Sequence, residues 1–196
     1  MSNAAAAPAP WVVRWAHLIA PGGSILDVAA GSGRHVRWLA DQGFAVTAID
    51  RDAAAMHALA ECAQTIVADI ERDAWPLHGH SFDAVLVTNY LWRPLLPAIV
   101  AATASGGVLL YETFAAGNES MGRPARPDFL LAPGELLGVV KGLRIVAYED
   151  GFLDDPDRFV QRIVAVRERH ASSPARHRLA GASRSSTSAG SLESTG

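Results

Sequence analysis

Apolar positions follow two different periods along the chain, and the two periods alternate. Apolar residues recur every three to four positions, as on one face of a helix, in residues 11–19, 36–40, 52–63 and 95–103. Short apolar runs between these segments indicate strands at residues 25–28, 44–50, 65–68, 82–89 and 108–113. Strands that alternate with helices are typical of a parallel sheet covered by helices.

The pattern changes after residue 113. Residues 115–131 form a long polar connection with several glycines and prolines, and we expect it to form a lid or binding loop. A short helix at 134–140 precedes two strand-like runs, 143–148 and 159–166, which predict an antiparallel hairpin at the sheet edge. We therefore predict an α/β fold: a doubly wound sheet of seven strands, six parallel and one antiparallel in the edge hairpin, with helices on both faces.

Composition limits the number of domains. The 196 residues can bury one substantial core, which we place at residues 11–168. Residues 1–10 are rich in alanine and proline, so we expect a disordered N-terminus or a remnant of cloning. Residues 169–196 are rich in Ser, Ala, Arg and Gly, so we expect a disordered tail.

The net charge says little about partners, and the cysteine count bears on the cell compartment. A formal net charge of −3 gives no overall basic field for nucleic acid. We expect no membrane segment, because no run approaches the ~18 apolar residues of a span. The lone Cys62 cannot form an internal disulfide, so we expect a cytoplasmic protein. Neither Cys62 nor His57 has partners at metal-ligand spacing, and we predict no metal site.

One segment, Ser24 to His35, combines a strand, a turn and a helix start. An apolar strand that contains Asp27 leads into the small-residue turn Ala29-Ala30-Gly31-Ser32-Gly33, and an amphipathic helix follows. Small side chains let a ligand approach the backbone, and the first turn of a helix leaves N–H groups unpaired. This arrangement predicts a binding site for a ligand with acceptor atoms.

The spacing of the glycines limits which class of ligand this turn can bind. A dinucleotide fingerprint needs a third glycine where Val36 stands, and no Gly-Lys-Ser/Thr run marks a P-loop. The carboxylate of Asp27 would repel a pyrophosphate, but it could accept hydrogen bonds from an ammonium group. The turn therefore fits a zwitterionic amino-acid group.

Residues Ile25 to Gly33 resemble motif I of the class I S-adenosylmethionine-dependent methyltransferases, with Ala29 where the first glycine often stands. Strand ends at Asp50 and Asp69 resemble the second and third strands of that family, and residues 82–89 resemble the fourth. The resemblance spans roughly residues 11 to 167. It implies a Rossmann-like fold, S-adenosylmethionine as cofactor and S-adenosylhomocysteine as product.

The resemblance also implies cofactor-binding residues at the turn and the strand ends. Asp50 would hold the ribose hydroxyls and Asp69 the adenine amino group. The residues leave alternatives open: Asp50 or Asp52 could cap the next helix, and Asp69 could be one of several surface acids. The expected cofactor-binding set is Asp27, Ala29, Gly31, Gly33, Asp50, Arg51, Asp69, Ile70 and Asn89.

Candidates for the acceptor side follow the fourth and fifth strands. We expect Glu112 to act as a general base and Tyr90 to act at the reacting centre, where its ring could face the sulfonium or simply pack. The expected substrate-binding residues are Trp92, Asn118, Arg123 and Arg126. Glu112-Thr-Phe, Gly117-Asn-Glu and the stretch from Arg123 to Leu137 resemble small bacterial methyltransferases of the tellurite-resistance type.

The resemblance implies transfer of a methyl group to a small-molecule acceptor by in-line displacement. Two alternatives stay open: an enzyme that acts on RNA or protein, which the arginines of the tail could serve, and a non-catalytic binding module with this fold. We expect a monomer or homodimer.

Overall fold

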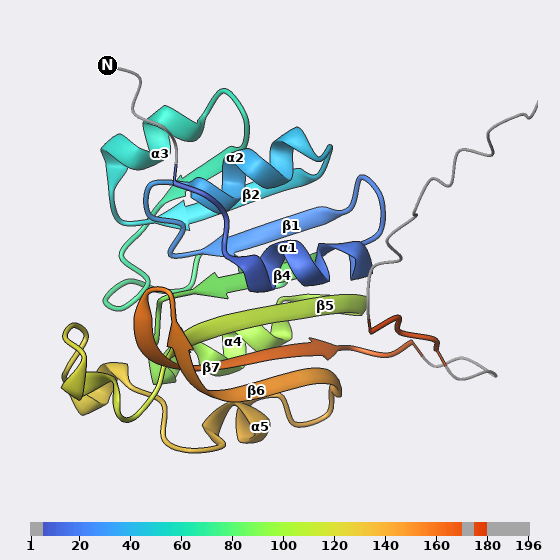
Figure 1. Cartoon of the computed structure of the whole chain (residues 1–196). Helices are drawn as coiled ribbons and strands as arrows, with labels where there is room; N and C mark the ends of the chain where they lie inside the picture. Colours follow the sequence, from blue (N-terminus) through green and yellow to red (C-terminus); the bar gives the residue numbers. More distant parts are fainter. Residues whose placement is uncertain (1–5, 170–174, 180–196) are drawn as a thin grey trace, which may run out of the picture.

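The computed structural model describes residues 6–169 and 175–179, with seven strands in one sheet, in the order β3-β2-β1-β4-β5-β7-β6 (Figure 1). The first five strands are parallel, and β7 runs antiparallel to both β5 and β6. Six strands therefore share one direction, which confirms the predicted sheet. The strands are β1 (Ser24–Val28), β2 (Ala45–Asp50), β3 (Gln64–Val67), β4 (Phe82–Thr88), β5 (Thr103–Phe114), β6 (Arg144–Asp154) and β7 (Asp157–Val166).

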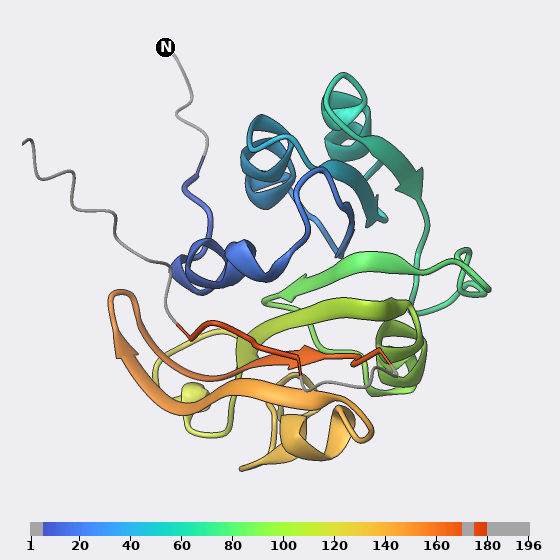
Figure 2. The same cartoon turned by 90° about the vertical axis from the view of Figure 1, so that its right-hand side faces the viewer.

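Helices cover both faces of the sheet, as predicted, and Figure 2 shows the two layers. One face carries α1 (Pro10–Trp15), α2 (Arg34–Asp41) and α3 (Ala53–Leu59), and the other carries α4 (Leu96–Ala101) and α5 (Glu135–Val139). Short 3-10 turns are η1 (Ala16–Leu18), η2 (Arg93–Leu95), η3 (Asn118–Ser120) and η4 (Pro127–Phe129). Among the described residues, none of the helices is long and apolar enough to cross a membrane.

The sheet separates two hydrophobic clusters. On the α1 side, Trp11 and Trp15 pack with Leu39 and Met56, all of them buried. On the other side, Ile99 and Leu136 pack against the opposite faces of the same strands. Both faces of β1, β4 and β5 are therefore apolar, which is why these strands appear in the sequence as nearly continuous apolar runs.

Element boundaries differ from the sequence prediction at several ends. The ordered chain begins before position 11, because Ala9 is already buried and Pro10 occupies the first turn of α1, where its missing N–H costs nothing. The predicted helix at 52–63 ends at Leu59, and β5 begins at Thr103 instead of residue 108. Residues 1–5, and the tail at 170–174 and 180–196, lie outside the described residues.

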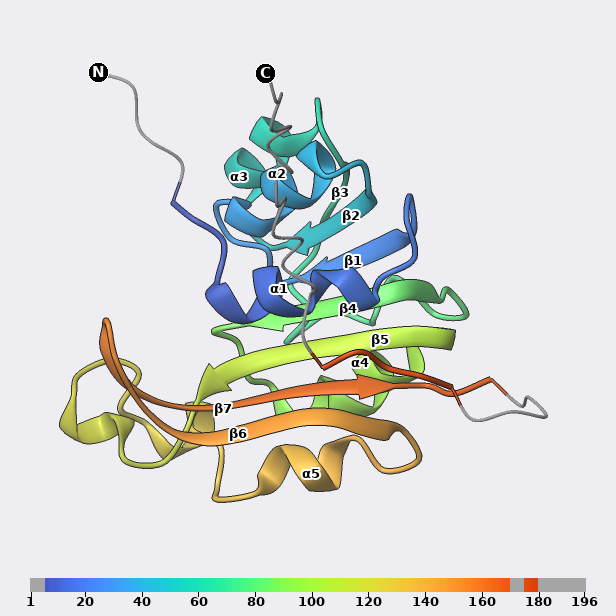
Figure 3. The same cartoon turned by 45° about the vertical axis from the view of Figure 1, so that its right-hand side comes forward.

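The carboxyl ends of the parallel strands share one edge of the sheet. The loop that follows β5 and the turn between β6 and β7 extend from the same edge (Figures 1 and 3). In doubly wound sheets this edge is where ligands bind.

Candidate functional site

The turn after β1 has a left-handed backbone, which most side chains rarely adopt. Ala29 has φ 55° and Gly33 has φ 77°, both in the left-handed region. A Cβ atom on Gly33 would lie 2.4 Å from the side chain of Leu59, at the end of α3. Gly33 therefore lets α3 pack closely against the start of α2, and this contact fixes the shape of the turn.

Asp27 is a buried acid at this turn. Its side chain is 1% exposed, and its Oδ2 atom has no hydrogen-bond partner among the described residues. Burial raises the pKa of Asp27 to about 8, although the nearby charge of Arg34 opposes the shift. Buried polar atoms are normally paired, so this oxygen lacks the donor that such a position needs.

Asp50, at the end of β2, joins two turns. Its carboxylate accepts hydrogen bonds from the backbone N–H of Gly31 (2.8 Å) and of Asp52 (2.9 Å). The cap of α3 is Asp52, which accepts from Ala54 and Ala55. Asp50 is therefore free of the capping role that the sequence left open.

A cavity of about 260 Å³ opens beside these turns. The structure brings six of the predicted site residues together in its wall. Asp69 lies there with its Oδ1 atom 3.2 Å from the N–H of Glu71, which donates to it. The lining residues are Ala29, Asp50, Arg51, Ala68, Asp69, Ile70, Glu71 and Tyr90.

The segment after β4 contributes Asn89 and Tyr90. Asn89 has φ 54° and is exposed, and its N–H donates to the carbonyl of Glu112. Tyr90 lines the cavity, and burial is the main cause that raises the pKa of its hydroxyl, so the phenol stays protonated near neutral pH. Tyr90 is thus placed on the cavity of Asp50 and Asp69, and it is unsuited to accept a proton.

The environment of Glu112 differs from that of a free general base. The carboxylate is 1% exposed and lies 3.2 Å from Arg158 and 3.5 Å from Arg162. Arg162 also pairs with Glu149, which in turn contacts Arg14. Glu112 is therefore the centre of an ion-pair network. The sequence shows a carboxylate at the end of a strand, but it does not show whether that carboxylate pairs with arginines or is free to accept a proton.

The predicted substrate-binding residues lie apart from the 260 Å³ cavity. Both ends of the Asn118 amide are used, since Nδ2 donates to Pro124 O and Oδ1 accepts from Phe159 N. Arg123 lines a separate cavity of about 250 Å³, together with Asn118 and Arg158.

The other two predicted substrate-binding residues, Arg126 and Trp92, contact different parts of the protein. Arg126 is exposed and pairs with Asp128 at 2.7 Å. Trp92 is half-buried and packs against the core on the α4 side. The structure therefore does not gather Trp92, Asn118, Arg123 and Arg126 into one pocket.

The loop after β5 is closed at its base. Leu131 N–H donates to Phe114 O (3.0 Å), and Ala116 N–H donates to Leu131 O (2.9 Å). A compact loop with adjoining ends is an Ω-loop, and such loops are frequently functional. Under it lies a cavity of about 460 Å³ whose wall is mostly apolar: Arg93, Ala116, Glu119, Ala125, Pro127, Leu130, Leu131, Ala132 and Pro133.

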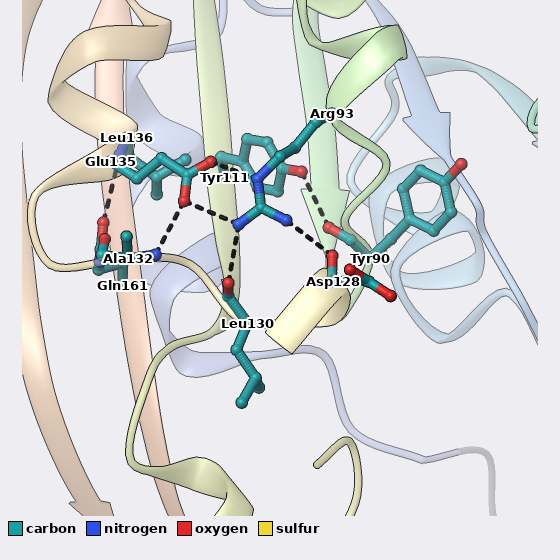
Figure 4. Close-up of polar contacts among 9 residues, drawn as sticks. All are labelled: Tyr90, Arg93, Tyr111, Asp128, Leu130, Ala132, Glu135, Leu136 and Gln161. Carbon is teal, nitrogen blue, oxygen red and sulfur yellow. Dashed lines mark hydrogen bonds and ion pairs between the residues drawn. The ribbon is translucent and has the colours of Figure 1, made fainter. Parts of the chain in front are cut away.

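Arg93, which the sequence did not single out, holds this loop in place (Figure 4). Its guanidinium donates to both oxygens of Glu135, at 2.7 and 2.9 Å, and to the carbonyls of Asp128 and Leu130, both at 2.8 Å. Glu135 also accepts from the N–H of Ala132. Arg93 therefore ties the segment after β4 to the end of the Ω-loop and to α5.

His35 is a second residue that the sequence gave no role. Its Nε2 atom accepts from the N–H of Ala9 (3.1 Å), so the neutral ring carries its hydrogen on Nδ1, which donates to Thr88 Oγ1 (3.4 Å). Burial lowers the pKa of His35 to about 4. The neutral imidazole connects the chain before α1, the first turn of α2 and the end of β4.

Comparison with known proteins places this site in context. Residues 25–107 match the family described as a methyltransferase domain. No curated protein matches the sequence. Among the described residues, no group of His, Cys, Asp or Glu side chains could hold a metal ion.

Several solved structures have the same fold. TehB from Haemophilus influenzae is 22% identical, with a TM-score of 0.62 over 78% of this chain and 60% of TehB. A SAM-dependent methyltransferase from Methanosarcina mazei is 15% identical, with a TM-score of 0.65 over 83% of this chain and 99% of its own. A TehB-like SAM-dependent methyltransferase from Corynebacterium glutamicum is 23% identical, with a TM-score of 0.56 over 76% and 85% of the two chains. This chain thus spans less than two thirds of TehB, and identities this low show the fold alone.

Proposed function

We propose that this chain is a class I S-adenosylmethionine-dependent methyltransferase, and that it transfers the methyl group of its cofactor to a small-molecule acceptor. The observation that carries the proposal is the set of acids at the carboxyl ends of the first strands. Asp50 and Asp69 line one cavity, and Asp27, near the end of β1, has an oxygen without a hydrogen-bond partner in the described part of the chain.

These residues fit the parts of S-adenosylmethionine. In this proposal the carboxylate of Asp50 accepts hydrogen bonds from the ribose hydroxyls, and that of Asp69 accepts from the adenine amino group. The unpaired Oδ2 of Asp27 receives a hydrogen from the ammonium of the amino-acid part, directly or through water. The apolar side chains of Ala68 and Ile70 offer a surface for the adenine ring.

Catalysis in this proposal consists mainly of alignment. The sulfonium of the bound cofactor supplies an electrophilic methyl group, so the protein has to hold the acceptor in line and exclude water. A soft nucleophile needs no general base, whereas an amine or hydroxyl acceptor does. Glu112 as that base stays a prediction, and its two arginine partners make it the first assignment to test.

The cavities near the loop after β5 support a small acceptor. The 460 Å³ cavity under the Ω-loop has the size of ordinary small-molecule sites, and its wall of Ala, Pro and Leu side chains suits an apolar group. Its two charged lining residues, Arg93 and Glu119, are both hydrogen bonded within the chain.

The cytoplasmic location also stays a prediction from the sequence.

Two measurements test the proposal. Calorimetry should show binding of S-adenosylmethionine and S-adenosylhomocysteine, and heat with a nicotinamide dinucleotide but with neither of these would overturn it. A screen with radiolabelled cofactor across amines, thiols, phenols and RNA should then label a small acceptor. Labelling of RNA or protein alone would replace the small-molecule assignment, and tight cofactor binding without any turnover would favour a non-catalytic binding module.

A further inference from the structure

We propose that the methyl acceptor carries a carboxylate, and that Arg123 and Arg158 bind this group in the cavity of about 250 Å³. The inference rests on the proposed function, because it names the chemical class of the acceptor. The cavity lies between the Ω-loop and the turn that joins β6 to β7, and both extend from the edge of the sheet where the parallel strands end (Figures 1 and 3).

The first observation is a row of ion pairs that ends at this cavity. Glu112 pairs with Arg158 and Arg162, and Glu149 pairs with Arg162 and Arg14. The row Arg14-Glu149-Arg162-Glu112-Arg158 therefore has arginine at both ends and carries one surplus positive charge. The side chain of Arg14 is 53% exposed and well solvated, whereas that of Arg158 is only 14% exposed. The surplus charge is therefore costly mainly at Arg158, where water compensates it least.

Arg158 has one nitrogen left for an anion. Its Nη2 atom donates to Glu112 at 3.2 Å. Its Nε atom is enclosed and has no partner among the described residues, so a ligand cannot reach it. Its Nη1 atom is also unpaired within the described ranges, but it is not enclosed. Nη1 is therefore the donor that Arg158 presents to a ligand in the cavity.

Arg123 supplies a second guanidinium, from the Ω-loop. It lines the same cavity, is exposed, and makes no ion pair with any residue that the structure describes. Arg126 of the same loop differs, because it pairs with Asp128. Guanidinium groups match the geometry of a carboxylate, and hydrogen bonds between ionised groups are the stronger ones. One carboxylate is therefore bound from two sides, by the loop and by β7.

The charges around the cavity favour a carboxylate over a phosphate. Arg123 and the surplus charge of the row contribute two positive charges, and Asp157, which also lines the cavity, contributes one negative charge, so one positive charge remains. A carboxylate carries one negative charge, whereas a phosphate monoester carries about −1.5 to −2. Phe114, Met121 and Pro156 give the wall apolar surface for a carbon skeleton. The Ω-loop also lines the 460 Å³ cavity, so one loop contacts both the anionic and the apolar part of the acceptor.

The carboxylate binds and takes no part in the bond changes. The nucleophilic atom of the acceptor forms a bond to the methyl carbon, and the carbon–sulfur bond breaks with its electron pair left on sulfur. The products are the methylated acceptor and S-adenosylhomocysteine, and a thiolate acceptor has no proton to lose. Arg123 and Arg158 are therefore substrate-binding residues, and their loss should raise KM for an acid more than it lowers kcat.

Binding of benzoate tests the site, in the free protein and in its complex with S-adenosylhomocysteine. Benzamide is the uncharged probe and phenyl phosphate the phosphate probe. NMR titration should show saturable binding of benzoate, with both other probes about tenfold weaker. Arg123→Gln should weaken benzoate about tenfold. Lys141→Gln, which removes an exposed positive charge outside the cavity, should bind benzoate like wild type.

Arg158→Gln is the second variant, and Arg162→Gln is its control for stability. Loss of Arg158 leaves Glu112 paired with Arg162 and removes the surplus charge. Its thermal midpoint should therefore fall less than that of Arg162→Gln, which leaves both Glu112 and Glu149 without this partner. Benzoate should nevertheless bind Arg158→Gln about tenfold more weakly than wild type.

Matched acceptors test the substrate class: 4-mercaptobenzoate against 4-mercaptobenzamide, and 4-aminobenzoate against 4-aminobenzamide. The acids should have a kcat/KM about tenfold above the amides, and Arg123→Gln should remove this preference through KM. Equal values for acid and amide, or transfer to neutral acceptors alone, would refute the inference. Benzoate binding that Arg123→Gln leaves unchanged, or tighter binding of phenyl phosphate, would refute it too. A wild type that binds no S-adenosylhomocysteine or methylates no acceptor refutes the proposed function instead, and the benzoate titration then still decides whether the cavity binds a carboxylate.

Discussion

The carboxylate of Asp50 lies 2.8 Å from the backbone nitrogen of Gly31, so the end of β2 is hydrogen bonded to the turn that follows β1. Asp52, two residues later, bonds to the first turn of α3. Asp50 therefore connects two turns, whereas Asp52 caps α3. Substitution of one residue can serve as the control for substitution of the other.

Asp50→Ala should weaken binding of S-adenosylmethionine about ten- to hundredfold, because it removes a charged acceptor from the cavity. Asp52→Ala should leave the affinity near wild type and lower the free energy of unfolding by about 0.5–2 kcal/mol, the usual cost of a lost cap. Calorimetry and urea unfolding of both variants check this. Equal affinities in two folded variants would show that Asp50 does not bind the cofactor.

Asp27 and His35 predict how the stability of the free protein depends on pH. The pKa of Asp27 rises from 3.8 to about 8 on folding, so its contribution to stability is lost as the pH increases from about 4 to 8. The pKa of His35 falls from 6.5 to about 4, so its contribution is lost as the pH decreases over that range. The two effects oppose each other below pH 6.5, and only that of Asp27 remains above it.

The free energy of unfolding should therefore fall between pH 6.5 and 8, by at most about 1.4 kcal/mol per pH unit. Urea unfolding at both pH values checks this, and Asp27→Asn should remove the slope.

Binding of the cofactor ammonium beside Asp27 should also release a proton at pH 7, which calorimetry in buffers of different ionisation enthalpy measures. If the free energy of unfolding of wild type and of Asp27→Asn changed in parallel with pH, the raised pKa of Asp27 would be contradicted.

Glu112→Gln should destabilise the fold by about 3–5 kcal/mol, since it leaves Arg158 and Arg162 without their buried carboxylate. Glu149→Gln is the control, because the Glu149 carboxylate is 41% exposed and such pairs contribute at most about 1 kcal/mol. Urea unfolding measures both. If Glu112 is also the general base, the folded variant loses the acid limb of its pH–rate profile, and an unchanged profile would end that assignment.

Arg93→Lys should loosen the end of the Ω-loop, because lysine cannot reproduce the paired contacts to Glu135 and the two carbonyls. Faster amide hydrogen exchange is expected in residues 127–135, with cofactor affinity unchanged. Arg126→Lys, which alters an exposed pair with Asp128 and a contact over the ring of Phe129 but keeps the positive charge, should exchange like wild type. Identical exchange in both variants would mean that Arg93 does not hold the loop.

The sequence predicted the fold because the signals were local. Parallel strands buried on both faces form apolar runs, and Gly33 and Gly43 mark turns at the two ends of α2. The meeting of Asp50 and Asp69 in one cavity was predictable for the same reason, since Asp50 ends β2, Asp69 follows β3, and the carboxyl ends of these strands meet at one edge.

Pairing over long sequence distances was not predictable. Glu112 meets Arg162 only through the antiparallel register of β5 with β7, and spacing along the chain does not contain that register. Arg93 and Glu135 are 42 positions apart, on segments with no shared pattern. Tyr90 could be placed after β4, but whether its hydroxyl had a partner depended on what surrounds it.

The hydrogen bonds that Leu131 makes to Phe114 and Ala116 separate the tip of the Ω-loop from the sheet. Since the two ends of the loop already meet, doubling the length between them would cost only about 0.6 kcal/mol of closure entropy. Residues 119–126 can therefore be exchanged as a cassette, by insertion or by wholesale replacement, while the strands and the cavity of Asp50 keep their geometry. If the cavity beside this loop holds the acceptor, as proposed above, exchanging the cassette should change the choice of acceptor and leave the affinity for the cofactor unchanged.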